Sequence, residues 1–188
     1  GAKPSVVIEL WQTPATDTTG AKIASYTLPA TETSHKFVNL PTNAADGTAY
    51  IYIAKEQAVE GFVTTYSADK LTVYNTEKPT SITVTKNWNN GNYTGSDAIK
   101  RPSITVYLLN GDDKNTIADN AGSHTFDAGM KNTDSWAFNN LPEGRYVNET
   151  YTKYVYQVVE QENITGYTQG GAATSANSYT LTNTLQTL

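Results

Sequence analysis

The strongest constraint on the fold is an internal repeat, because segments of the first half of the sequence recur in the second half. The offset between matching segments grows along the chain from 98 to 108 residues. Such a drift indicates short insertions in loops of the second copy, where insertions are tolerated. The sequence therefore predicts two related domains in tandem, residues 1–78 and residues 79–188. The matching segments are residues 3–10 with 101–108, 37–41 with 138–142, 52–57 with 156–161, 61–62 with 166–167, and 73–76 with 181–184.

The two copies differ at their beginnings. In the second copy, residues 81–100 precede the first matching segment and contain an alternating Thr-rich stretch followed by an Asn/Gly-rich loop. The first copy starts almost directly at that segment, so the first domain is predicted to lack its opening strand. Either the sequence begins inside a domain, or another segment or chain supplies the strand. Strand exchange with a second chain is one such route, because an exposed sheet edge invites association.

Both copies carry the pattern of β-strands. Stretches of strand length alternate or run apolar, and clusters of Gly, Asn, Asp and Pro separate them. Short strands between turn signals predict an all-β chain with one β-sandwich per repeat and at most a turn or two of helix. The stretches are residues 82–88, 103–109, 154–160 and 178–185 in the second copy and residues 5–11, 49–56 and 70–76 in the first.

Composition argues against several classes of function. The 188 residues include 13 Lys and Arg against 18 Asp and Glu, a net charge of −5 with no basic run, so nucleic acid is not an expected partner. No apolar stretch is long enough to span a membrane. The chain has no Cys, which rules out disulfides and thiol chemistry. Its two histidines have no metal-ligand or catalytic partner at a recognisable spacing, so we expect no metal and no cofactor.

Three polar side chains are predicted to lie on apolar strand faces, because successive side chains of a strand point to opposite sides of the sheet. A buried charge without a partner costs several kcal/mol, and a buried amide costs a few. Each of the three therefore needs an explanation. They are Lys86 on the face of Ile82, Val84 and Trp88, Glu160 on the face of Tyr154, Tyr156 and Val158, and Asn183 on the face of Tyr179, Leu181 and Leu185.

Each of these residues has an ordinary structural explanation when it is taken alone. An inward Lys is often an edge-strand residue that extends to water, and an Asn near a strand end often caps a turn. The coincidence of all three in one domain is harder to explain in that way. Two of them recur in the first copy, where Glu56 and Asn75 occupy the matching positions, while the counterpart of Lys86 would lie before residue 1.

The second copy resembles the CnaB-type domain, which is the B-repeat module of Gram-positive collagen adhesins and the domain type of many pilins. The resemblance covers residues 81–185, and residues 3–77 follow the same pattern without its first strand. It implies two tandem Ig-like/prealbumin-like CnaB β-sandwich domains, the first without its opening strand. The residues that carry the resemblance are 84–88, 100–102, 136–142, 156–160, 166–167 and 181–184.

The resemblance implies an autocatalytic isopeptide bond between Lys86 and Asn183, with Glu160 as the catalytic acid. The chemistry suits these residue types, because burial favours a neutral, nucleophilic amine and an uncharged carboxyl group. The reaction happens once per chain, so no enzyme acting on other molecules is implied. The first domain offers Glu56 and Asn75 but no such lysine. We therefore expect an incomplete site there, with no intramolecular bond.

These expectations favour a structural role. The chain is predicted to be a stalk segment of a Gram-positive adhesin or pilus, outside the cell and attached to the cell wall in the full-length protein. Its expected partners are neighbouring domains of the same surface protein. The alternative is a ligand-binding adhesin region that recognises a host matrix protein or glycan, because fold alone does not determine function. Tandem repetition with a short linker favours the stalk, whereas measurable affinity for matrix proteins or glycans would favour the alternative.

Overall fold

A computed structural model describes residues 2–14, 19–93, 99–115, 117, 119–129 and 131–186. These residues form strands and turns without helix, which confirms the predicted all-β class. It follows that the described part contains no helix capable of crossing a membrane. The chain divides into two compact units: unit 1 comprises Gly1–Lys78 with Glu143–Thr152, and unit 2 comprises Pro79–Pro142 with Lys153–Leu188. The predicted domains 1–78 and 79–188 differ from these units only in the placement of residues 143–152.

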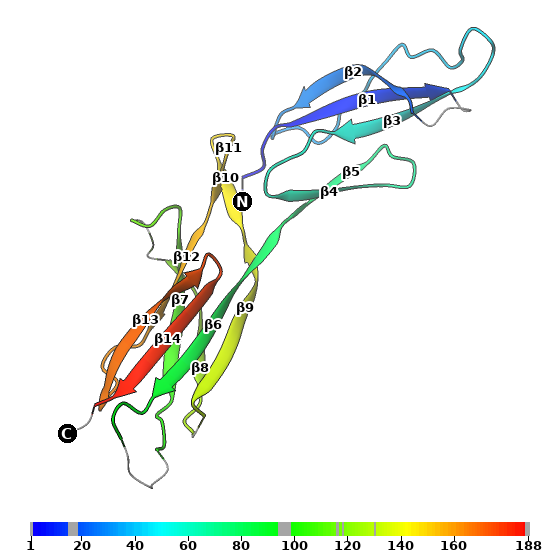
Figure 1. Ribbon diagram of the computed structural model, residues 1–188. Helices are drawn as coiled ribbons and strands as arrows, with labels where there is room; N and C mark the ends of the chain where they lie inside the picture. Colours follow the sequence, from blue (N-terminus) through cyan, green and yellow to red (C-terminus); the bar gives the residue numbers. More distant parts are fainter. Residues whose placement is uncertain are drawn as a thin grey trace. The chain divides into compact units, whose positions relative to one another are not determined.

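Unit 2 contains two sheets (Figure 1), with strand orders β13-β14-β6-β9 and β12-β7-β8. Neighbouring strands are antiparallel except for β14 and β6, which pair in parallel from Ser178↔Thr83 to Thr184↔Asn89. The first and last strands of the unit therefore lie side by side. The strands of this unit are β6 (Pro79–Asn89), β7 (Ile104–Gly111), β8 (Asp119–Phe126), β9 (Thr133–Pro142), β12 (Val155–Glu160), β13 (Tyr167–Ser175) and β14 (Ser178–Leu185).

The core of unit 2 lies between these two sheets. Ile82 and Val84 of β6 and the alternate residues Ile104, Val106 and Leu108 of β7 are 0% exposed. Full burial of each such side chain contributes about 1.5–3 kcal/mol relative to exposure. The period-two pattern therefore fixes which face of each strand points inward.

Unit 1 repeats most of this arrangement, with sheets β2-β1-β3 and β4-β5. Two equivalent hydrogen bonds support the alignment: the Tyr52 hydroxyl donates to the Pro41 carbonyl at 2.5 Å, and the Tyr156 hydroxyl donates to the Pro142 carbonyl at 2.6 Å. The strands are β1 (Val6–Pro14), β2 (Ala21–Leu28), β3 (Tyr50–Glu56), β4 (Phe62–Tyr66) and β5 (Val73–Glu77). This unit also includes the hairpin of β10 (Gly144–Val147) and β11 (Thr150–Lys153), which form a sheet of their own.

By this alignment, the described part of unit 1 lacks counterparts of two strands, β6 and β9. Residues 37–41, which align with the end of β9, form no strand. The sequence predicts the loss of the opening strand only. The absence of a counterpart of β9 has a physical cause. In unit 2, β9 pairs with β6, so that a strand at the position of β9 would have no partner in the described part of unit 1.

With these two strands absent, the inner face of unit 1 is only partly covered by other strands. Leu10 and Ala54 are buried, at 4% and 9% exposure, but Val6 and Ile8 are only partly buried. Their counterparts in β7, Ile104 and Val106, are fully enclosed.

Candidate functional site

Lys86 is fully buried in unit 2, with 0% of its side chain exposed. It lies on the inward face of β6, as the alternation of residues 82–88 predicts. Its Nζ atom is 3.4 Å from Oε2 of Glu160 and 3.2 Å from the carbonyl oxygen of Asn87. The Nζ atom also lies 4.6 Å from the centroid of the Trp88 ring. The amine is therefore held in place without access to water.

Burial lowers the pKa of Lys86 from 10.5 to about 8, and the nearby Glu160 opposes this shift only in part. Loss of hydration disfavours the charged ammonium, which is the cause of the lowering. A shift of 10.5 − 8 = 2.5 units raises the fraction of neutral amine at pH 7 roughly 300-fold, to about one molecule in ten. A neutral amine, unlike an ammonium ion, has a free electron pair for nucleophilic attack.

Asn183 lies on the inward face of β14 and is 0% exposed. In the parallel register Lys86 is opposite Leu181, so Asn183 lies two residues further along the same face. This diagonal separation is within reach of a long side chain. The Nδ2 atom of Asn183 donates to Oε1 of Glu160 at 2.5 Å, and Oδ1 of Asn183 has no hydrogen-bond partner among the described residues.

Glu160 connects the other two residues from the opposite sheet. It is the last residue of β12, and its side chain is 6% exposed. One carboxyl oxygen faces Lys86 and the other faces Asn183. The structure therefore brings together all three residues that the sequence singles out in the second copy.

In unit 1 the structure brings together the two corresponding residues. The Nδ2 atom of Asn75 donates to Oε2 of Glu56 at 3.0 Å. The hydroxyl of Thr64 lies 2.8 Å from Oδ1 of Asn75 and 3.2 Å from Oε1 of Glu56. Asn75 is exposed, and among the described residues no lysine forms an ion pair or a side-chain hydrogen bond with Asn75 or Glu56.

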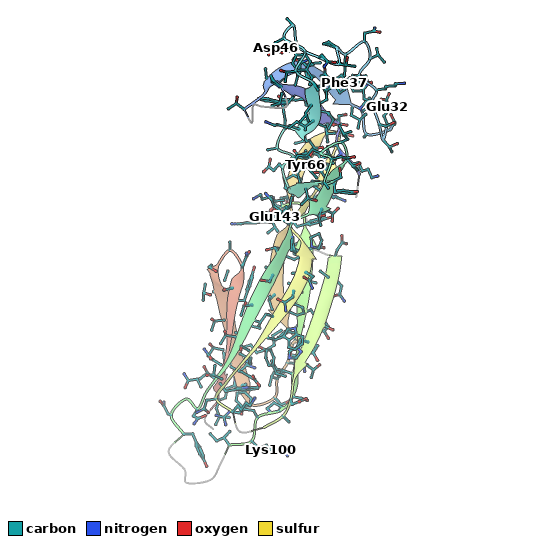
Figure 2. The ribbon with its side chains drawn as sticks, turned by 90° about the vertical axis from the view of Figure 1, so that its right-hand side faces the viewer. Glu32, Phe37, Asp46, Tyr66, Lys100 and Glu143 are labelled. Carbon is teal, nitrogen blue, oxygen red and sulfur yellow. The ribbon has the colours of Figure 1, made fainter. Side chains whose placement is uncertain are left out.

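The sequence places Trp88 on the face of Lys86, and its ring contacts the amine. Two further neighbours of these sites, Thr64 and Tyr66, are not predicted from the sequence. Thr64 is opposite Asn75 in the pairing of β4 with β5, and only the period-two pattern of β4 could have pointed to it. Tyr66, labelled in Figure 2, accepts a hydrogen bond from the backbone N–H of Glu56 at 3.0 Å. The described residues contain no group of side chains suited to a metal ion.

The two-sheet architecture of unit 2, with its buried polar trio, defines an Ig-like β-sandwich module, and unit 1 is an incomplete copy of it. The chain belongs to the family of Cna protein B-type domains, whose family model matches residues 1–76 and 82–184. Such domains are parts of Gram-positive surface proteins, among them adhesins.

Similar solved structures come from the collagen-binding surface protein Cna of Staphylococcus aureus. A single B repeat unit (B1) is 22% identical, with a TM-score of 0.41, over 100% of this chain and 90% of that one. A structure of two B repeat units (B1B2) is also 22% identical, with a TM-score of 0.40, over 98% of this chain and 44% of that one. No curated protein sequence gives a significant match.

Proposed function

We propose that this chain is a structural stalk segment of a Gram-positive cell-surface adhesin or pilus, in which unit 2 is closed by an amide bond between Lys86 and Asn183. One observation carries the proposal: the buried amine of Lys86 and the buried amide of Asn183 contact the two oxygens of one carboxyl group, at 3.4 Å and 2.5 Å. A buried lysine or a buried asparagine with a purely structural role would not need to contact the same carboxyl group as the other.

The proposed reaction is a single transamidation. The neutral Nζ of Lys86 attacks Cγ of Asn183, the new C–N bond forms, the Cγ–Nδ2 bond breaks, and ammonia leaves. Glu160 carries a proton from the attacking amine to the departing nitrogen. Because an amide is a poor electrophile, the reaction depends on positioning, for which effective molarities of roughly 10⁵–10⁸ M are available.

Either end of the Asn183 amide fits the contact with Glu160, because the oxygen and nitrogen of a side-chain amide are assigned from the hydrogen-bond network. Turning the Asn183 amide by 180° would place Oδ1 at the 2.5 Å position and give this otherwise unpartnered oxygen a donor. A protonated carboxyl group in that position would polarise the carbonyl towards attack.

The position of the bond suits a load-bearing role. Lys86 belongs to the first strand of unit 2 and Asn183 to the last. Tension that enters at one end of the unit and leaves at the other would pass through a covalent link instead of through backbone hydrogen bonds. In a chain without cysteine, this link would supply the stabilisation that disulfides give to many extracellular domains. The expected partners are neighbouring domains of the same surface protein.

We predict that the intact mass of the purified chain is lower than the mass calculated from its sequence by one ammonia. Lys86→Ala is expected to show the full calculated mass, because the nucleophile is removed. Lys131→Ala is the matched control, since this lysine of unit 2 is 74% exposed, and it should retain the loss of one ammonia. An unmodified mass for the wild-type chain would refute the bond. A loss of two ammonia molecules would show that unit 1 also closes by itself.

We predict that Glu160→Gln slows bond formation by roughly 10²–10⁴-fold, the usual contribution of a positioned acid–base group. Gln preserves the shape of the side chain but cannot carry a proton. The rate is measured as the appearance of the ammonia-deficient mass with time after synthesis of the chain. Glu162→Gln is the control, because Glu162 is exposed and follows the end of β12. A folded Glu160→Gln chain that cross-links as fast as the wild type would exclude this role for Glu160.

A further inference from the structure

Strand β12 of unit 2 has a free edge at a position where its counterpart in unit 1 is hydrogen-bonded. The N–H of Gln161 donates to the carbonyl oxygen of Thr105 at 2.8 Å, so the backbone groups of Val158, three residues earlier, point away from β7. In unit 1 the counterpart of Val158 is Ala54, whose N–H donates to the carbonyl oxygen of Lys70 at 2.9 Å. Among the described residues the N–H of Val158 has no such acceptor. Free edges of this kind can accept another strand.

The difference between the two units follows from the length of the next hairpin. Between the matching segments 61–62 and 73–76, unit 1 has the ten residues 63–72, whereas unit 2 has the thirteen residues 168–180. The shorter hairpin turns directly after Tyr66, and Lys70 in this turn reaches the edge of β3. In unit 2 the longer strands β13 and β14 continue to Ser175 and Ser178. Their turn makes no backbone hydrogen bond with the described residues of β12.

A groove of about 360 Å³ lies at this free edge, between β12 and β13. Its lining includes Val158 and Leu181, which are only 5% and 6% exposed, so the groove reaches the core of unit 2. On the β13 side it is lined by Gly171 and Ala173, and residues this small leave the space unfilled. Pockets that bind ligands usually measure about 300–1,000 Å³ and have mainly apolar walls. The groove therefore has the size and the lining to receive an apolar side chain.

Polar groups at the groove indicate what kind of ligand it fits. The hydroxyl of Tyr179 donates to the carbonyl oxygen of Tyr156 at 2.7 Å, so this backbone group also points out of the sheet. Two residues further along the same edge, the N–H of Val158 is a donor for a backbone carbonyl. Lys114 is the one charged side chain among the described residues that line the groove, in a chain whose net charge is −5. The complementary ligand offers a peptide carbonyl, an apolar side chain and a carboxylate.

We propose that unit 2 binds an extended segment of a partner protein, with alternating acidic and apolar residues, along the free edge of β12. A carbonyl of the segment accepts from the N–H of Val158, as the carbonyl of Lys70 accepts from Ala54 in unit 1. One apolar side chain enters the groove, and a neighbouring carboxylate pairs with Lys114. Strand addition of this kind combines backbone hydrogen bonds with pockets for alternate side chains. The binding uses no group of the Lys86 site, so it goes beyond the proposed stalk function and does not depend on it.

A titration of the full ¹⁵N-labelled chain with a short peptide tests the proposal. The probe is acetyl-Glu-Val-Glu-Val-Glu-amide, and the measurement is the NMR signal of each backbone amide. We expect the signal of Val158 to shift and to saturate with a Kd below about 1 mM. The signal of Ala54 is the internal control and should stay unchanged, because its N–H is already bonded to Lys70. The peptide acetyl-Lys-Val-Lys-Val-Lys-amide should bind more weakly, since its charges repel Lys114.

Two variants test the groove and its charge. Ala173 pairs with Tyr179 and so lies on the inward face of β13, and Ala173→Trp should fill the groove and abolish the shift at Val158. Ser123→Trp is the control, at an exposed position of β8 outside the groove. Lys114→Glu should weaken binding of the acidic peptide roughly three- to tenfold, as expected for reversing one exposed ion pair. Lys100→Glu, at an exposed position outside the groove, should leave this Kd unchanged.

Each contrary outcome overturns a defined part of the proposal. No shift at Val158 with either peptide would mean that the edge of β12 accepts no strand. Equal binding of the acidic and the basic peptide would rule out an acidic partner. Hexanoate supplies an apolar chain and a carboxylate without a peptide backbone, and if it bound as tightly as the acidic peptide, the groove would be a small-molecule site instead. None of these outcomes bears on the mass of the chain, so the proposed cross-link is tested separately.

Discussion

Pulling the chain from its two ends is expected to leave the 183 − 86 = 97 residues between the cross-linked side chains unextended. Force enters unit 2 at β6 and leaves at β14, and these neighbouring strands run in parallel. The load therefore shears the pair along its length, and the proposed Lys86–Asn183 bond would carry it. Without the bond, the same 97 residues would add roughly 320–350 Å of contour length on unfolding.

Single-molecule force spectroscopy measures this difference directly. The wild-type chain should show no event of that length, whereas Lys86→Met should show it, because Met fills similar space but has no amine. Lys131→Met is the control, since its exposed side chain takes no part in the site, and it should behave as the wild type. An event of full length in the wild-type chain would mean that no covalent link closes unit 2.

The second large effect is expected in chemical denaturation. A cross-link that closes a loop of 97 residues reduces the entropy of the unfolded chain, which contributes roughly 4–5 kcal/mol in the chain-entropy treatment. Lys86→Met should therefore lower the free energy of unfolding of unit 2 by about that amount, roughly a 700- to 4,000-fold change in the equilibrium constant. Met also keeps the cavity filled, so that loss of packing adds little.

Denaturant titrations followed by the fluorescence of Trp88 and Trp136, which both lie in unit 2, provide the measurement. The transition of unit 1 should be unchanged in the variant, because no group of unit 1 is altered. Equal midpoints for the wild type and Lys86→Met in unit 2 would contradict a stabilising cross-link.

Sequence patterns predicted the inward faces of the three critical strands, because strand side chains alternate with a period of two. Lys86 and Asn183 are fully buried as a result. The family resemblance was also recognisable from sequence and is confirmed by the match over residues 1–76 and 82–184. Spacing along the chain could not show that β12 of one sheet brings Glu160 between two strands of the other, because that arrangement depends on how the sheets pack.

In unit 1, too, some features could be predicted from the sequence and others could not. The repeat offsets predicted a missing opening strand, but not that residues 37–41 would also remain outside any sheet. That second change follows from pairing, which connects residues far apart in sequence and fails when one partner is absent. Nor did the sequence indicate that Thr64 would hold Asn75 and Glu56 together.

The sequence by itself determined the repeat, the strand class, the inward faces and the absence of disulfides. These properties depend on local periodicity and on residue type. Only the tertiary structure decided that the first and last strands of unit 2 are parallel neighbours and that one carboxyl group contacts both an amine and an amide. These properties depend on contacts between distant segments, which form only when the sheets assemble and exclude water from the space between them.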